Sequence, residues 1–161
     1  MTTTIQQADL IESISAALQY ISYYHPADYI AHLAKAYERE QSPAAKDAMA
    51  QILTNSKMSA TGQRPICQDT GIVNVFLKVG MDVRWGGFTG SLDDAINEGV
   101  RRGYNHPDNT LRASVVADPQ FARKNTKDNT PAVIFTEIVP GNTVDITVAA
   151  KGGGSENKSK M

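Results

Sequence analysis

The sequence predicts an α+β protein, because helical periodicity near its N-terminus gives way to β-branched runs separated by turn residues. Apolar residues recur at three- and four-residue spacings over residues 7–24, which places them on one face of a helix. Residues 72–79 and 132–139 are rich in valine and isoleucine, as is typical of strands. This order indicates an N-terminal helical segment followed by a small mixed, partly antiparallel sheet with flanking helices.

Three helices are expected in residues 1–56. Pro26 interrupts the first pattern, because proline is tolerated in the first turn of a helix but not in its interior. A second apolar face follows over residues 29–37. Ser42 and Pro43 are typical of an N-cap and of the first position of a third helix.

Residues 57–161 are expected to be α+β and to form one domain with the helical segment. Residues 59–65 predict a loop, and Ser91 predicts the N-cap of a helix over residues 92–104. Residues 105–130 are rich in proline, asparagine and aspartate, so we expect long functional loops there. Pro140-Gly141-Asn142 predicts a hairpin turn between strands over residues 132–139 and 143–149.

Composition excludes several classes of function. The 161 residues carry a net charge of −1 without a basic stripe, which argues against a nucleic-acid partner. The apolar runs are shorter than the roughly 18 residues that a membrane span needs. One cysteine excludes an internal disulfide framework and favours a reducing compartment. The first residues lack the features of a secretory signal, so a cytoplasmic location is expected.

Cys67 is the first candidate for chemistry, in the segment Pro65-Ile66-Cys67-Gln68-Asp69-Thr70-Gly71 ahead of a predicted strand. A lone cysteine is usually structural, but polar neighbours are unusual for a buried one. A nucleophilic cysteine needs a histidine partner, and His25, His32 and His106 show no supporting spacing. One thiolate cannot close a metal site by itself. Cys67 is therefore either inert or one ligand of a site whose other ligands lie elsewhere.

Two further segments carry groups that suit an anion. Glycines in Lys151-Gly152-Gly153-Gly154-Ser155 allow backbone N–H groups to approach a ligand oxygen, although a flexible loop or linker is the alternative. The segment lacks the Gly-Lys-Ser/Thr of a phosphate loop, whereas Lys151, Lys158 and its N–H groups favour a dicarboxylate. Arg112 lies in a polar loop and is the residue type that clamps a carboxylate.

Taken together, these segments resemble the signature segments of class I, iron–sulfur-dependent fumarate hydratases, a superfamily that includes the L-tartrate dehydratase α subunit. The segments that carry the resemblance are Pro65–Gly71, Asp108–Arg112 and Ala150–Lys158, with Trp85-Gly86-Gly87 and Asn125-Thr126 between them. The resemblance implies reversible hydration of fumarate to L-malate, with the open iron of a [4Fe–4S] cluster as Lewis acid. It implies that Cys67 is a cluster ligand and that Gln68, Asp69, Arg112 and Gly154 bind the substrate, with Lys151 in support.

The resemblance also implies that this chain is the N-terminal part of the catalytic region. Two further cysteine ligands and the general base would lie beyond Met161, in a C-terminal half or a β subunit, so no catalytic residue is assigned here. The isolated chain is expected to be inactive, and the complete protein is expected to be a homodimer. Three alternatives stay open: an L-tartrate dehydratase, a non-catalytic anion-binding or assembly module with a structural Cys67, and a folding fragment without a function of its own.

Overall fold

The computed structural model describes residues 2–67 and 70–152, and it has the predicted α+β architecture. The chain forms two compact units: Met1–Gln19 with Asp69–Met161, the first unit, and Tyr20–Gln68, the second unit. The single domain over residues 1–161 stays a prediction. Among the described residues, no helix is both long and apolar enough to cross a bilayer.

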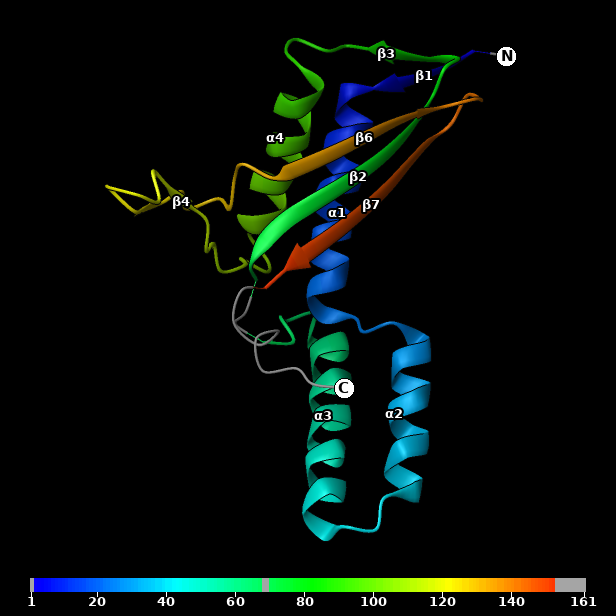
Figure 1. The fold of residues 1–161 in the computed structure, drawn as a ribbon, viewed down its shortest axis with the longest axis vertical. Helices are drawn as coiled ribbons and strands as arrows, with labels where there is room; N and C mark the ends of the chain where they lie inside the picture. The colour runs from blue at the N-terminus through cyan, green and yellow to red at the C-terminus, as the bar shows by residue number, and fades with distance from the viewer. Residues whose placement is uncertain (1, 68–69, 153–161) are drawn as a thin grey trace. The chain divides into compact units, whose positions relative to one another are not determined.

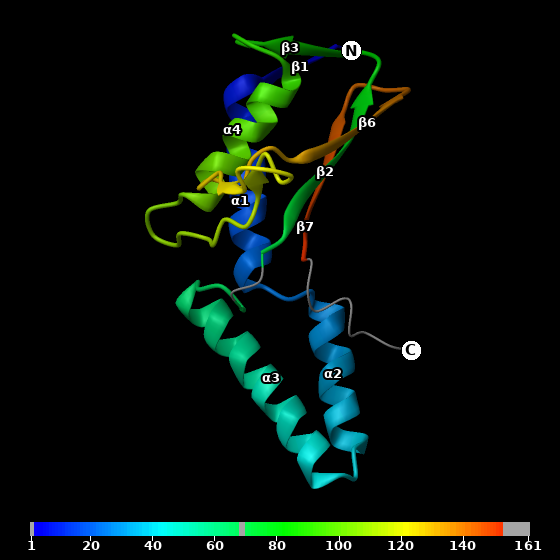
Figure 2. The same ribbon diagram turned by 60° about the vertical axis from the view of Figure 1, so that its left-hand side comes forward.

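A three-stranded mixed sheet is the centre of the first unit. Its middle strand is β2 (Ile72–Gly80), with β6 (Val133–Val139) parallel on one side and β7 (Val144–Lys151) antiparallel on the other. Helices α1 (Gln7–Tyr23) and α4 (Leu92–Tyr104) lie against one face of this sheet (Figures 1 and 2). The mixed sheet agrees with the sequence prediction.

The core lies between the sheet and these two helices. Alternate residues of β2 are buried because successive side chains of a strand point to opposite faces. The buried apolar side chains of the core come from α1, β2, α4 and the following loop: Leu10, Ile11, Ile14, Leu18, Val73, Val75, Leu77, Val79, Ala95, Ile96, Val100, Tyr104 and Leu111. Gly99 lets α1 and α4 pack closely, since a Cβ there would lie 2.8 Å from the Ile14 Cβ.

The opposite face of the sheet carries exposed apolar side chains. The rings of Phe76 on β2 and Phe135 on β6 stack with their centroids 4.9 Å apart, and they are 45% and 50% exposed. Ile72 and Val133 are exposed on the same face, because they alternate with the buried side chains. Among the described elements of the first unit, helices cover only the other face.

The Pro140-Gly141-Asn142 turn does not form the predicted hairpin. Strands β6 and β7 are consecutive, but β2 lies between them and pairs with both. The turn instead accepts bonds from the end of β2, where the Asp82 N–H donates to the Gly141 carbonyl at 2.9 Å. A local turn signal shows that the chain reverses, but it does not determine which strands pair.

Two short sheets complete the first unit. β1 (Thr3–Gln6) pairs in parallel with β3 (Val83–Gly86), and β4 (Val116–Ala117) pairs antiparallel with β5 (Lys124–Asn125). The sequence pattern does not predict β1, since this polar four-residue segment has no apolar alternation of its own.

The second unit contains the helices α2 (Ala27–Arg39) and α3 (Pro43–Gly62). The predicted cap of α3 is confirmed, because the Ser42 side chain accepts a hydrogen bond from the Ala45 N–H. The loop predicted over residues 59–65 is partly wrong: α3 runs on to Gly62 and ends at Gln63, which has a left-handed backbone. That conformation is a common way for a helix to end.

Candidate functional site

The ends of two signature segments meet at the start of β2. In the antiparallel pairing of β2 with β7, Ile72 lies opposite Lys151, the first residue of the glycine-rich segment. Gly71 directly precedes this pair and has a φ of +61°. A Cβ on Gly71 would lie 1.7 Å from the Lys151 carbonyl oxygen. Only glycine permits both this backbone conformation and this approach.

The segment around Arg112 joins the same place. The Thr70 hydroxyl donates to the Arg112 carbonyl, and the Ser114 hydroxyl donates to the Gly71 carbonyl at 2.9 Å. The Arg112 side chain itself is exposed. The three signature segments are therefore in contact through Thr70–Gly71, Arg112–Ser114 and Lys151–Gly152, all in the first unit.

A buried amide, Asn129, connects two of these segments. Its side chain is 0% exposed. Its Oδ1 accepts from the backbone N–H groups of Ser114 at 2.7 Å and Val115 at 3.0 Å, and its Nδ2 donates to the Gly71 carbonyl at 3.0 Å. Buried polar groups are costly unless they are hydrogen-bonded, and this amide meets that requirement on both of its polar atoms.

A second buried amide holds the base of the Arg112 loop. The Gln19 Nε2 of α1 donates to the carbonyls of Gly103 and Asn109, at 2.6 and 3.0 Å, and the Asn109 Nδ2 donates back to the Gln19 Oε1 at 2.9 Å. Burial raises the pKa of Tyr104 at the end of α4, and hydrogen bonds with the Thr70 and Asn129 side chains partly offset this effect. The hydrogen bonds of Gln19 thus connect the loop backbone at Asn109 to α1 and to the end of α4.

Cys67 belongs to the second unit, where the residue before it is fixed by two helices. The Ile66 N–H donates to the Ser22 carbonyl at the end of α1, at 2.8 Å. The Asn55 Nδ2 of α3 donates to the Ile66 carbonyl at 2.9 Å. The Cys67 side chain is exposed to solvent. An exposed thiol on an anchored backbone suits metal ligation better than a role in core packing.

The structure thus brings together two of the six predicted site residues, Arg112 and Lys151. Cys67 lies in the other unit, and Gln68, Asp69 and Gly154 lie outside the described residues. The Lys151 side chain is exposed, and its Nζ donates to the Gly152 carbonyl at 2.8 Å. Within residues 2–67 and 70–152, no three histidine, cysteine, aspartate or glutamate side chains gather as a metal site.

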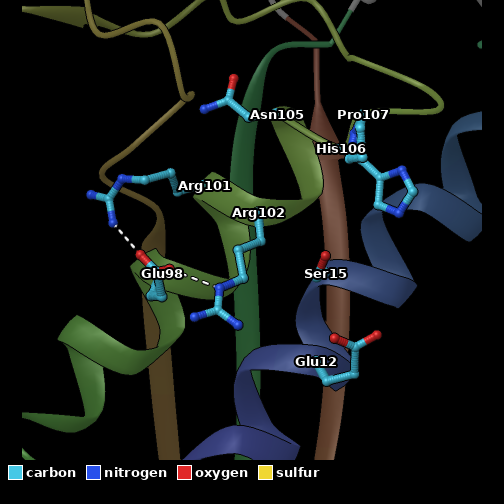
Figure 3. Close-up of a pocket in the computed structure, with 8 residues that line it drawn as sticks. All are labelled: Glu12, Ser15, Glu98, Arg101, Arg102, Asn105, His106 and Pro107. Atoms are coloured by element: carbon cyan, nitrogen blue, oxygen red, sulfur yellow. Dashed lines mark hydrogen bonds and ion pairs between the residues drawn. The ribbon is translucent and has the colours of Figure 1, made fainter.

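Figure 3 shows a pocket between α1 and α4 that none of the predicted site residues lines. Its volume is about 440 Å³, and its walls include Glu12, Glu98, Arg101 and Arg102. Glu98 accepts from Arg102 Nε at 2.8 Å and from an Arg101 guanidinium nitrogen at 2.5 Å, so both cations already have a carboxylate partner. Hydrogen bonds from Arg102, and then from Arg101, lower the pKa of Glu98. This charge balance does not favour an anion site.

The sequence prediction missed Asn129 and Gln19, which hold the site together without facing solvent. A signal for Asn129 exists: its φ is +60°, and asparagine tolerates the left-handed region better than most residues do. Gln19 has a weaker signal, as a polar residue within the apolar pattern of α1. Neither signal alone identifies the carbonyl and N–H groups that these amides bind.

Comparisons with known proteins show the family to which this chain belongs. The family model for fumarate hydratase (Fumerase) matches residues 11–161. The putative L(+)-tartrate dehydratase subunit alpha of Methanocaldococcus jannaschii is 32% identical over 144 residues, which are 86% of this chain and 48% of the relative. The anaerobic class I fumarate hydratase of Escherichia coli is 34% identical over 125 residues, 78% of this chain and 22% of the relative.

A third relative is the aerobic class I fumarate hydratase of Salmonella typhimurium, 37% identical over 111 residues that cover 69% of this chain and 18% of the relative. The chain thus spans about half the length of the tartrate dehydratase subunit and about a fifth of the fumarate hydratases. The family match covers nearly the whole chain, including all three signature segments. The chain therefore belongs to the class I fumarate hydratase family, a family of hydro-lyases.

Proposed function

We propose that this chain is the N-terminal part of an iron–sulfur hydro-lyase that interconverts fumarate and L-malate. The observation that carries the proposal is the meeting of Thr70–Gly71, Arg112–Ser114 and Lys151–Gly152 at the start of β2. Every residue for which the family resemblance implies substrate binding lies within these segments or no more than two residues from them in the sequence. These segments meet in one unit although neither helical periodicity nor core packing requires them to do so. Their meeting therefore supports a common role.

Arg112 is the proposed clamp for one substrate carboxylate. Arg112 is an exposed residue, and its carbonyl accepts a hydrogen bond from the Thr70 hydroxyl. A planar guanidinium donates two parallel hydrogen bonds to a carboxylate, an arrangement that the ammonium group of lysine cannot reproduce. Lys151 adds a second cation and has a supporting role. Gln68, Asp69 and a backbone group at Gly154 complete the proposed substrate contacts.

Cys67 is the proposed thiolate ligand of a [4Fe–4S] cluster. Its exposed side chain and the anchored Ile66 backbone fit a ligand. The chain contains one cysteine, so two further cysteine ligands must come from the remainder of the protein. When bound, the cluster supplies a Lewis-acidic iron that assists departure of the substrate hydroxyl. The general base is also assigned to the remainder.

An L-tartrate dehydratase is the second candidate function. The observation that favours it is the M. jannaschii relative named as a tartrate dehydratase subunit alpha, which matches 86% of this chain. Tartrate differs from malate by one hydroxyl group, so the same clamp and the same cluster would serve both substrates. The groups that choose between the substrates are proposed to lie outside residues 2–67 and 70–152.

We also propose that a C-terminal half or a β subunit completes the protein and that the complete protein is a homodimer. Relatives of greater length support the first part of this proposal. A cytoplasmic location is proposed because a thiolate ligand of an oxygen-labile cluster needs a reducing compartment.

The decisive experiment measures fumarate formation from L-malate by ultraviolet absorbance, with L-tartrate as the competing substrate. The sample is the complete protein, reconstituted anaerobically with iron and sulfide. We expect turnover of L-malate that is lost in air and in Cys67→Ser. Turnover of L-tartrate alone would favour the second candidate. A sample without cluster absorbance and without turnover would refute both candidates and leave an anion-binding or assembly module.

A further inference from the structure

Asn129 lies where the proposed substrate-binding segments meet, although it lacks the properties by which active-site residues are usually recognised. Its side chain is fully buried, and it has neither a charge nor a nucleophile. Its contacts are nevertheless concentrated on two segments of the site. The Oδ1 binds the N–H groups of Ser114 and Val115, which follow Arg112, and the Nδ2 binds the carbonyl of Gly71, which follows Thr70.

These bonds form part of a closed network. The Gly71 carbonyl accepts from both the Asn129 Nδ2 and the Ser114 hydroxyl, and the Thr70 hydroxyl donates to the Arg112 carbonyl. The two segments are therefore tied to each other directly and through one shared amide. Buried networks of this kind are costly when they are only partly satisfied.

The backbone of Asn129 explains why this residue type is needed. Its φ of +60° is in the left-handed region, which glycine and asparagine adopt most readily. Glycine would supply the conformation without the amide. Aspartate would supply two acceptor oxygens but, when ionised, no donor for the Gly71 carbonyl. Asparagine combines a readily adopted left-handed backbone conformation with one acceptor and one donor group on the same short side chain.

We propose that Asn129 is a positioning residue for the hydro-lyase reaction, which sets the Arg112 backbone relative to the Thr70–Gly71 segment. This inference rests on the proposed function. Asn129 does not touch the substrate, since its side chain has no exposed area. It acts through the backbone of Arg112–Ser114, and it thereby fixes where the guanidinium emerges. Small displacements of a binding group are expensive, because a misplacement of about 1 Å costs on the order of 100-fold in rate.

Two variants separate the roles of the amide. Asn129→Gly keeps the left-handed backbone and removes both polar atoms. Asn129→Asp keeps the acceptor for the Ser114 and Val115 N–H groups and replaces the Nδ2 donor, whose partners include the Gly71 carbonyl. If Asn129→Gly fails to fold, Asn129→Asp keeps the inference testable. Asn97→Ala is the matched control, because the Asn97 Oδ1 accepts from the Ala132 N–H at 2.9 Å and binds neither site segment.

The measurement is the KM and kcat for L-malate of the complete, cluster-loaded protein, together with hydrogen exchange of the Ser114 and Val115 amides. We expect KM to rise roughly tenfold or more in both Asn129 variants, since the carboxylate clamp is misplaced in each. Exchange of the two amides should accelerate in Asn129→Gly and stay near the wild-type rate in Asn129→Asp. Asn97→Ala should keep the wild-type KM.

A merely structural role predicts a different pattern. Partial unfolding lowers the active fraction and therefore kcat, while KM stays the same. An unchanged KM in the folded Asn129 variants, beside an active wild type, would overturn the positioning role and leave the proposed function intact. A cluster-loaded wild type that turns over no dicarboxylate would overturn both, so the two failures are distinguishable.

Discussion

Replacement of Gly71 by alanine tests the contact between the Cys67-containing segment and the glycine-rich segment. The new Cβ would lie 1.7 Å from the Lys151 carbonyl oxygen, 2.2 Å from the Lys151 carbonyl carbon and 2.5 Å from the Gly152 Cα. All three are backbone atoms, so no side-chain rotation relieves the overlap. Either the end of β7 moves away from β2, or Gly71 leaves its φ of +61°.

Both costs can be estimated. A left-handed conformation costs a residue with a Cβ about 1–2 kcal/mol. Forcing an extra carbon into a packed position typically costs about 1–3 kcal/mol. Together they predict that Gly71→Ala lowers the free energy of unfolding by roughly 2–5 kcal/mol. A protein of ordinary stability loses a large part of its margin with such a change.

Urea unfolding followed by circular dichroism measures this loss, and Gly87→Ala is the matched control. Gly87 has nearly the same conformation, with a φ of +69°, but its added Cβ would meet only the Gln6 Oε1 at 3.3 Å. The control should therefore show the backbone cost without the overlap, about 1–2 kcal/mol. Equal losses in the two variants would refute the close approach of Gly71 to Lys151.

Three further variants test other parts of the molecule. Hydrogen bonds from Arg102 and Arg101 lower the pKa of Glu98. This carboxylate therefore stabilises the fold above its unfolded pKa and ceases to do so as pH falls through its folded pKa. Thermal melts between about pH 5 and pH 3 should show that the stability of the wild type falls more steeply than that of Glu98→Gln. Cys67→Ser should abolish the visible absorbance of the reconstituted complete protein while leaving its apo melting temperature unchanged, because the side chain is exposed; an intact cluster spectrum would exclude Cys67 as a ligand. Arg112→Lys should raise the KM for L-malate about 10- to 100-fold, as expected for loss of a charged hydrogen bond of about 1.5–3 kcal/mol, and an unchanged KM would remove Arg112 from the proposed site.

Local signals predicted some elements closely. The helix expected over residues 92–104 is α4, with the same bounds. Its cap explains this success, because the Ser91 hydroxyl accepts from the Asp94 N–H while the Asp94 carboxylate accepts from the Ser91 N–H. All the groups that start this helix lie within four consecutive residues. An element whose ends are determined locally can be read from the sequence.

Strand pairing could not be read in this way. The turn at residues 140–142 predicted a hairpin, but β6 pairs in parallel with β2, and β7 takes the opposite side of β2. The parallel pair needs a long crossover, which here contains α4 and the loops over residues 105–132. What selects this pairing is the burial of the β2 face against α1 and α4, and that burial depends on residues far apart in the chain.

The same distinction between local and distant information applies to the candidate site. Arg112 and Lys151 could be proposed from the sequence because their residue types suit a carboxylate and their segments are polar. Asn129 could not, since its importance lies in which distant N–H and carbonyl groups it binds. Residue type indicates what a side chain can do, whereas the positions of buried partners become known only with the fold.

The long loop between α4 and β6 illustrates why a polar, proline-rich segment need not be flexible. Gln19 holds its base at Asn109, Thr70 holds the Arg112 carbonyl, and Asn129 holds the two N–H groups beyond Ala113. In the proposed role of Arg112 as a carboxylate clamp, the ordering cost would therefore fall on its side-chain torsions and not on the loop backbone. Ordering one long side chain costs about 0.5–1.5 kcal/mol, whereas ordering each backbone residue costs about 1–2 kcal/mol. If Arg112 has the proposed role, the buried amides lower the free-energy cost of binding by holding the backbone of its loop.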